Sequence, residues 1–137
     1  MSEKVEFELV SPERLLVSES VEMVVVPGSE GDFGVLAGHS ATVSALRAGV
    51  IAVFEDGAVT SRIFVSGGFA EVTPERCTVL ADDAVPLGEI DREAEEKAIP
   101  DLRDDAAAAR DEAEKDAAEK ALAIAEAKVA AVDSPVY

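Results

Sequence analysis

Apolar and polar residues alternate along the first part of the chain, in short runs separated by turn-forming residues. Every second residue of Val5–Leu9 is apolar, which is the two-residue period of a strand with one buried face. Val50–Phe54 and Ala58–Val65 flank Asp56-Gly57, a dipeptide that favours a tight hairpin turn. Many short strands separated by turns predict a β-sandwich or a flattened barrel. No helical crossover long enough to join parallel strands is present, so we expect antiparallel pairing.

The second part of the chain has a helical pattern. All nine glycines and all five phenylalanines lie at or before Gly88, and fifteen alanines follow it. Alanine is the best helix former, and apolar residues recur here every three or four positions. They form two narrow seams, which are Ala94, Ala98, Leu102 and Ala106 in the first and Ala118, Leu122, Ala125, Val129 and Val132 in the second. Two antiparallel helices in contact through these small residues would bury both seams.

Capping and breaking residues place the ends of the two helices. Asp91 is a suitable N-cap, and three glutamates follow it near the positive end of the helix dipole. The hairpin turns either at Pro100, which cannot donate a helical hydrogen bond, or in the polar stretch Arg110–Asp116, which gives helices of similar length. The sequence therefore predicts an α+β protein. An antiparallel β-sandwich or flattened barrel occupies residues 1–88, and an Ala-rich antiparallel helical hairpin occupies residues 89–137.

The charge of the chain restricts its partners. The formal net charge is −17, from 29 acidic and 12 basic residues. A nucleic-acid binder needs clustered basic residues, and so does a protein that adsorbs to anionic lipid, so we expect neither partner. No apolar run approaches the roughly 20 residues of a membrane-spanning helix, and the chain enters a strand pattern directly, without a signal peptide. A protein partner with basic groups fits this composition better.

Residues that usually carry catalysis are scarce. Cys77 is the single cysteine and His39 is the single histidine. One cysteine excludes an internal disulfide, and its place in a strand pattern predicts a small buried side chain. One histidine and one cysteine do not supply the ligands of a zinc site, so we expect no metal. A small acidic hydrolase built around His39 would lack both a nucleophile and an orienting partner.

The segment from Gly28 to His39 is rich in glycine, as a phosphate-binding loop is. It lacks the lysine and the hydroxyl residue of a P-loop, and Glu30 and Asp32 would repel a polyphosphate. Exposed loops on a rigid sheet commonly carry contact residues, and Asp32 and His39 decorate this reversal of the chain. We therefore expect a docking loop. The residues expected to shape it are Gly28, Gly31, Gly34 and Gly38.

The order of residues around this loop resembles a known family. The run Val25–His39 closely resembles the signature segment of the epsilon subunit of F-type ATP synthases. The match extends over Leu46–Val50, Val65–Val72 and Val79–Asp82. The resemblance covers nearly the whole chain in the same order, and the loop together with Ser66–Val72 makes it specific.

This resemblance implies a non-catalytic subunit of the rotor, in the central stalk of the enzyme. It implies binding to the gamma subunit and to the ring of c subunits, which couples proton translocation to ATP synthesis elsewhere in the complex. The implied location is peripheral, on the cytoplasmic face of the inner membrane, without insertion into the bilayer. The residues implied to face the c ring are Asp32, His39 and Glu30, and those implied to face gamma are Ser66, Thr42 and Leu46.

The tail carries a further family feature in altered form. Some members bind ATP where the first tail helix begins, through isoleucine or leucine, aspartate, two variable residues, arginine and alanine. Ile90 and Asp91 match this motif, but Ala94 and Glu95 stand where the motif has arginine and alanine. The missing cation argues against ATP binding, so we expect no cofactor. The resemblance also implies that the tail contacts the alpha/beta catalytic head in some states and regulates ATP hydrolysis.

A second hypothesis comes from a different class of protein. The chain would be a free-standing β-sandwich that binds a ligand or a protein, and its helical tail would mediate oligomerisation. Light scattering separates the two hypotheses, because a stable homo-oligomer formed through the tail favours the second.

Overall fold

A computed structural model of the chain describes residues 3–135 and 137. These residues fall into two compact units that divide between Leu87 and Gly88, with Tyr137 belonging to the first unit. The first unit is a β domain and the second is a helical hairpin, which confirms the predicted α+β class. The division lies one residue before the boundary expected from the sequence.

The β domain contains ten strands in the described residues. They are β1 (Val5–Ser11), β2 (Arg14–Val21), β3 (Met23–Gly28), β4 (Gly31–Leu36), β5 (Thr42–Leu46), β6 (Gly49–Glu55), β7 (Ala58–Val65), β8 (Gly68–Val72), β9 (Arg76–Ala81) and β10 (Ala84–Pro86).

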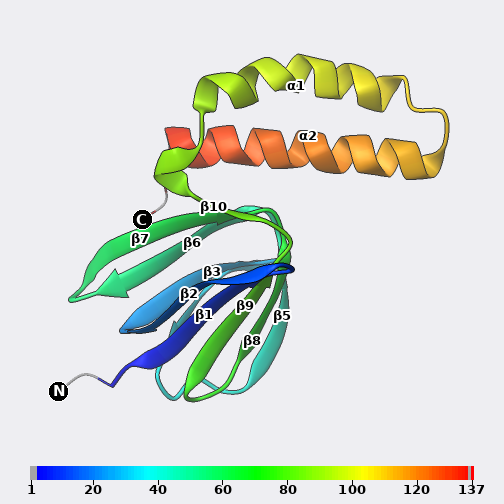
Figure 1. Cartoon of the computed structure of the whole chain (residues 1–137). Coiled ribbons are helices and arrows are strands. Elements are labelled where there is room, and N and C mark those ends of the chain that lie inside the picture. Colours follow the sequence, from blue (N-terminus) through cyan, green and yellow to red (C-terminus); the bar gives the residue numbers. More distant parts are fainter. Residues whose placement is uncertain (1–2, 136) are drawn as a thin grey trace. The chain divides into compact units, whose positions relative to one another are not determined.

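The strands form one curled sheet with two halves. Strands β4, β3, β6, β7 and β10 are neighbours in the first half, and β5, β8, β9, β1 and β2 are neighbours in the second. The halves are joined where Gly28 of β3 pairs with Leu46 of β5. Figure 1 shows how the sheet curls so that the halves face each other. Side chains that point inward from both halves therefore share one core.

The hydrophobic core follows the two-residue pattern of the sequence. Val5, Phe7 and Leu9 of β1 are all buried, as their spacing predicted. Cys77 of β9 is also fully buried, and this burial raises the pKa of its thiol to about 11. The thiol is therefore neutral near pH 7 and serves as a small apolar side chain, as expected.

One pairing differs from the antiparallel arrangement expected throughout. Strand β1 pairs with β9 in parallel, with Phe7 opposite Cys77 and Leu9 opposite Val79. The expectation considered only neighbouring strands, for which a parallel pair needs a helical crossover. Strands β1 and β9 are instead connected through seven intervening strands, so the chain can return in the same direction without a helix.

The turn predicted at Asp56-Gly57 is confirmed. Both residues have positive φ, 53° and 76°, as the primed hairpin turns require. Glu55 and Ala58 pair on either side of the turn, which sets the register of β6 against β7. That register holds only as far as Phe54, because the pairing shifts between Val53 and Phe54.

The tail consists of a short 3-10 helix (Leu87–Glu89) and two α-helices, α1 (Arg92–Ala107) and α2 (Glu112–Asp133). Asp91 caps α1 as predicted, because its carboxylate accepts a hydrogen bond of 3.1 Å from the amide of Ala94. Helix α1 continues through Pro100. The chain turns between the two helices, at a position that overlaps the start of the polar stretch favoured from the sequence.

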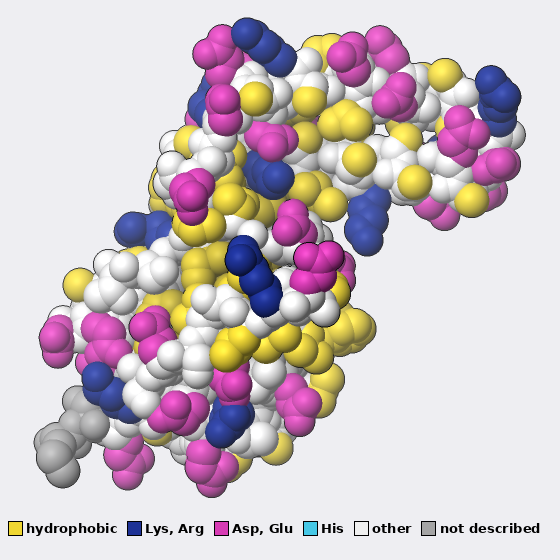
Figure 2. Space-filling model, viewed as in Figure 1, with side chains coloured by type: hydrophobic (Ala, Val, Ile, Leu, Met, Phe, Trp, Pro, Cys, Tyr) yellow, Lys and Arg dark blue, Asp and Glu magenta, His cyan; other side chains and the backbone are white. Residues whose placement is uncertain are grey.

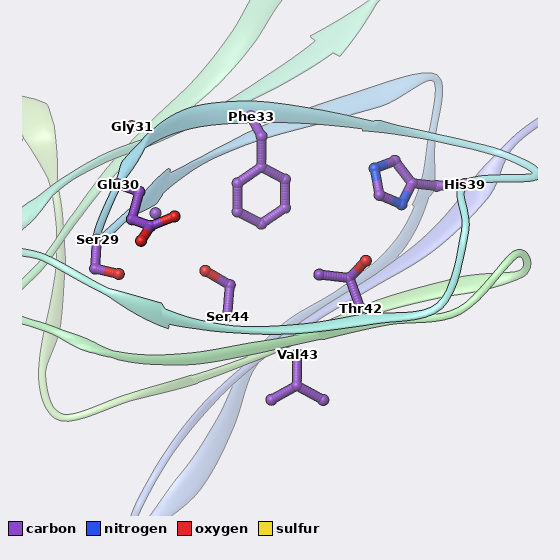
Figure 3. Close-up of a pocket in the computed structure, with 9 residues that line it drawn as sticks. Ser29, Glu30, Gly31, Phe33, His39, Thr42, Val43 and Ser44 are labelled. Atoms are coloured by element: carbon purple, nitrogen blue, oxygen red, sulfur yellow. The ribbon is translucent and has the colours of Figure 1, made fainter.

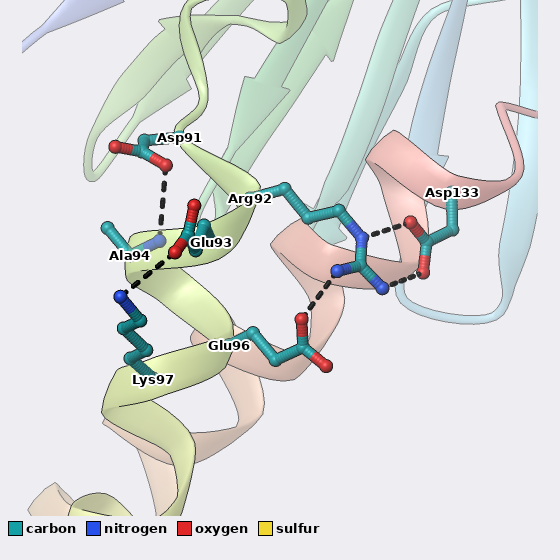
Figure 4. A network of polar contacts seen from close by, with 7 residues as sticks. All are labelled: Asp91, Arg92, Glu93, Ala94, Glu96, Lys97 and Asp133. Atoms are coloured by element: carbon teal, nitrogen blue, oxygen red, sulfur yellow. Dashed lines mark hydrogen bonds and ion pairs between the residues drawn. The ribbon is translucent and has the colours of Figure 1, made fainter.

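The two helices contact each other through the alanine-rich seams. Ala125 is buried, and most other members of the seams are half-buried. Ion pairs connect the helices near their open end, where the Arg92 guanidinium binds Asp133 and also Glu96 (Figure 4). This guanidinium lowers the pKa of the Asp133 carboxyl through their hydrogen bond. Exposed pairs of this kind contribute little stability each, so packing of the small side chains is the main contact.

Candidate functional site

The glycine-rich segment is a regular β-hairpin and not an irregular loop. Strands β3 and β4 pair along their whole length, from Gly28 opposite Gly31 to Met23 opposite Leu36. Asp32 lies near the start of β4, and His39 lies in the connection that follows this strand. The two residues are therefore separated by the length of β4.

Both carboxylate oxygens of Asp32 have partners within the β domain. One oxygen accepts a hydrogen bond of 2.5 Å from the Arg47 guanidinium, and the other accepts one of 3.0 Å from the Tyr137 hydroxyl. Arg47 also donates to the carbonyl of Gly28, at 2.5 Å. Asp32 thus connects the β3–β4 hairpin to Arg47 and Tyr137. The role of Arg47 was not evident from the sequence, because a pair 15 residues apart depends on how β3 and β5 meet.

Tyr137 belongs to the β domain, where its hydroxyl donates a hydrogen bond to Asp32. Its ring contacts Phe54 edge-to-face, with centroids 6.0 Å apart, and Arg62 donates hydrogen bonds to its carbonyl. Partial burial and the hydrogen bond to Asp32 raise the pKa of the Tyr137 phenol.

We predict that Asp32→Asn lowers the pKa of the Tyr137 phenol, because the charged acceptor that favours the protonated hydroxyl is removed. The chain has one tyrosine and no tryptophan, so an absorbance titration between pH 8 and 12 observes this group alone. Glu13→Gln, in the β1–β2 turn, is the matched control and should leave the titration unchanged. Identical curves for Asp32→Asn and the unmodified chain would contradict the contact.

A groove of about 380 Å³ separates β4 from β5 (Figure 3). Its lining consists of Gly28, Ser29, Glu30, Gly31, Phe33, His39, Thr42, Val43 and Ser44. The Phe33 ring stands in the middle of the groove, with Glu30 toward one end and His39 toward the other. The groove therefore contains Glu30 and His39, two of the residues implied to face a partner, while Asp32 is outside its lining.

The histidine of this groove is held by a neighbouring carbonyl. His39 Nδ1 donates to the carbonyl oxygen of Ser40 at 2.7 Å, so this nitrogen carries a proton. The ring of His39 is tilted against that of Phe33, with centroids 6.3 Å apart. These two contacts hold the His39 ring at the end of the groove, and the hydrogen bond does not use the other ring nitrogen, Nε2.

The glycines of the hairpin have two different functions. Gly38 has a φ of +85°, which glycine adopts without strain. Its amide donates a hydrogen bond of 2.7 Å to the carbonyl oxygen of Pro74. Gly28 instead permits a close approach, since a Cβ there would lie 2.6 Å from the Gly31 oxygen and 3.0 Å from the Phe33 ring. Gly31 has a positive φ of 141°, and Gly34 faces the Met23 sulfur.

Strand β5 has its polar side toward the interior of the domain. The side chains of Thr42 and Ser44 point toward the groove, whereas that of Val43 points away from it, and Val43 is 72% exposed (Figure 3). A strand of an isolated sandwich normally has the reverse pattern, with apolar residues inward and polar residues outward. Strand β5 therefore presents hydroxyl groups on one face and an apolar side chain on the other.

Five apolar residues form a continuous row across the second half of the sheet. Ala45 pairs with Phe69, Phe69 with Leu80, Leu80 with Val10, and Val10 with Leu15. We call these five residues, from β5, β8, β9, β1 and β2, the apolar stripe. Phe69, Leu80 and Leu15 are each at least half exposed. Hydrophobic side chains gather over β1 and β9 on the face shown in Figure 2.

The other residues to which the resemblance gave a role lie in different parts of the structure. Ser66 follows β7, where its hydroxyl and amide donate to the carbonyl of Asp83. Thr42 lies in the groove, and the side chain of Leu46 is buried in the core. A contact of β5 with a partner would therefore involve Val43 and Ala45. Ile90 precedes the cap of α1, and the Asp91 carboxylate is used for capping.

Two further properties concern the described residues. No helix among them is long and apolar enough to cross a membrane. No group of three or more histidine, cysteine, aspartate and glutamate side chains among them could hold a metal ion. The groove and the apolar stripe are surface features of the β domain that suit contact with other molecules. Together with the fold, they describe a small β-sandwich protein with a helical tail.

Comparison with known proteins identifies the family. The model of the ATP synthase delta/epsilon chain, beta-sandwich domain, matches residues 4–87. The ATP synthase epsilon chain of Rhodospirillum rubrum is 55% identical over 131 residues, which cover 96% of this chain and 98% of the relative. That of Paramagnetospirillum magneticum is 52% identical over 135 residues, covering 96% and 99%. The chain therefore belongs to the family of ATP synthase epsilon chains, which are non-catalytic subunits of that complex.

Solved structures give the same result for the fold. A chain in the cryo-EM structure of the Euglena gracilis mitochondrial ATP synthase, containing OSCP, F1 and c-ring, aligns with a TM-score of 0.81 and 35% identity. The alignment covers 94% of this chain and 81% of that one. A chain from the central stalk and c-ring of the Tetrahymena thermophila enzyme shares the fold, with a TM-score of 0.68 and 16% identity.

Proposed function

We propose that the protein is a subunit of the rotor, which binds gamma through the apolar stripe and faces the c ring with the β3–β4 hairpin. It couples proton translocation to ATP synthesis without making or breaking bonds itself. The location proposed is peripheral, at the cytoplasmic face of the inner membrane. The epsilon-chain relatives and the likeness to a chain of a c-ring-containing structure support this proposal.

The apolar stripe is the observation that carries the proposal. Five paired side chains cross the entire second half of the sheet, and three of the largest are at least half exposed. Contiguous apolar surfaces of this kind on soluble proteins commonly mark interfaces with other proteins. Complete burial of a large apolar side chain contributes roughly 1.5–3 kcal/mol, and this gain works against the free-energy cost of association, so the stripe would be one part of a larger interface.

The hairpin provides the second proposed contact. Glu30 lies in its two-residue turn, and the carboxylate points into the groove (Figure 3). A strongly acidic protein with this group at an exposed turn suits a partner surface that carries basic side chains. We assign this partner surface to the loops of the c ring, and we assign the regulatory contact with the alpha/beta head to the helical hairpin.

The proposal predicts the partners that the chain retains. The full chain, immobilised through an affinity tag, is incubated with a detergent extract of its native membranes, and bound proteins are identified by mass spectrometry. Gamma and c subunits should both be retained after washing. A chain that retains neither, and that forms a stable homo-oligomer in light scattering, would overturn the proposal in favour of a free-standing binding module.

A further inference from the structure

Tyr137 is bound by side chains from three strands of the first half of the sheet. Its hydroxyl donates to Asp32 of β4, its ring contacts Phe54 of β6, and its carbonyl accepts hydrogen bonds of 2.5 and 2.9 Å from Arg62 of β7. A sequence neighbour of each strand residue packs with the core, so the three side chains point to the opposite, outer face of the sheet. We call Asp32, Phe54 and Arg62 the tyrosine seat.

The seat has the polarity that a tyrosine side chain requires. The register places Val25 of β3 and Ala52 of β6 between Asp32 and Arg62, and both of these apolar residues are buried. A tyrosine combines an apolar ring with a hydroxyl that needs a hydrogen-bond partner. The outer face supplies apolar surface in its middle and the Asp32 carboxylate at its edge, so it suits both parts of the Tyr137 side chain.

The segment that joins Tyr137 to the tail is short and is held at its other end as well. Helix α2 ends at Asp133, four residues before Tyr137. The Asp133 carboxylate accepts two hydrogen bonds from the Arg92 guanidinium of α1, one of them 2.9 Å long, so the end of α2 is held within the helical hairpin. Four residues reach at most about 14 Å, which leaves little slack between the hairpin and a seated Tyr137.

We propose that Tyr137 and its seat form a releasable latch that restrains the helical tail. While Tyr137 is seated, the tail is attached to the β domain at two separate points, the covalent link at Gly88 and the seat. Two attachments restrict rotation of the hairpin, whereas the covalent link alone permits it. A molecule that takes up the tail in a new position must therefore first displace Tyr137. The latch is a property of the isolated chain, and it does not depend on the partners proposed above.

The first test measures whether the seat holds Tyr137 in solution. The chain has one tyrosine and no tryptophan, so quenching of its fluorescence by acrylamide observes this residue alone. Tyr137 is 37% exposed, so its release should raise the quenching constant about twofold or more. Arg62→Gln and Phe54→Leu should each produce this rise. Arg14→Gln, which removes an exposed arginine from β2, is the matched control and should leave the constant unchanged.

The second test measures how far the seat restrains the tail. Nitroxide labels are attached at Glu13→Cys in the β1–β2 turn and at Glu112→Cys in the first turn of α2, while the buried Cys77 thiol stays unlabelled. Pulsed electron paramagnetic resonance then gives the distribution of distances between the labels. Tyr137→Ala and Arg62→Gln should each widen this distribution about 1.5-fold or more, because one attachment is lost. Tyr137→Phe keeps the ring and the carbonyl and should widen it less.

The outcomes separate a latch from a merely structural contact. Dispersed amide spectra verify that each variant is folded. Equal distance distributions for the unmodified chain and Tyr137→Ala would overturn the latch, even if the quenching result holds. Widening by Tyr137→Ala without widening by Arg62→Gln would mean that Tyr137 acts outside the seat, and would overturn the inference as well. Both measurements use the isolated chain, so their failure leaves the proposed partners unaffected, and failure to retain those partners leaves the latch unaffected.

Discussion

Replacing Phe69 with glutamate should weaken the complex with gamma by at least about 100-fold. The side chain is 57% exposed in the free chain, and it lies between Ala45 and Leu80 in the apolar stripe. Docking would therefore bury an unpaired carboxylate among apolar groups, a change that costs several kcal/mol at the centre of an interface. Titration calorimetry with purified gamma measures the change.

The variant should fold normally, because Phe69 points away from the core. Its thermal unfolding is expected within a few degrees of that of the unmodified chain, roughly the effect of a surface substitution. Glu75→Gln, in the turn between β8 and β9, is the matched control at the opposite end of the strand, and it should bind gamma as before. Undiminished binding by Phe69→Glu would show that gamma docks elsewhere.

Replacing Gly68 with alanine should destabilise the β domain by about 3 kcal/mol or more. Gly68 has a φ of +134°, and a Cβ there would lie 2.0 Å from the carbonyl oxygen of Leu80. That oxygen belongs to β9, which pairs with β8 through Gly68 and Ala81. The methyl group cannot fit unless the two strands separate. Urea denaturation followed by circular dichroism gives the free energy of unfolding.

Gly88 provides the comparison for this substitution. No heavy atom lies within 4 Å of the Cβ position at Gly88, so Gly88→Ala should change the free energy of unfolding by less than about 1 kcal/mol. Similar midpoints for the two variants would mean that β8 can move away from β9 without loss of stability, and would contradict the close approach described at Gly68.

Much of the fold was predictable because it depends on local patterns. The alternation in Val5–Leu9 predicted a strand with one buried face, and Asp56-Gly57 predicted the hairpin turn. Asp91 was recognisable as a cap because aspartate before a helical run has a local hydrogen-bond partner. The parallel pairing of β1 with β9 was not predictable in this way, since it depends on how the whole sheet closes.

The candidate site was less accessible from the sequence. Glu30 and His39 were identified through the order of residues around them, and both line the groove. The apolar stripe was missed, because its members come from five strands and become neighbours only through the register of the sheet. The alternation of Thr42, Val43 and Ser44 was visible in the sequence. Which side of β5 faces inward was not, because periodicity alone does not assign a face.

Strand β5 has a mechanical consequence for a rotating assembly. Its hydroxyl face borders the groove, and its opposite face supplies Ala45 to the apolar stripe. In the proposed rotor, a tangential force on the β3–β4 hairpin would reach the apolar stripe through the junction of β3 with β5 and then through the paired strands of the second half of the sheet. The hydrogen bonds of β5 to β8 would share this force, and the close-packed core would resist deformation as well. Torque could thus be transmitted with little elastic lag inside the domain.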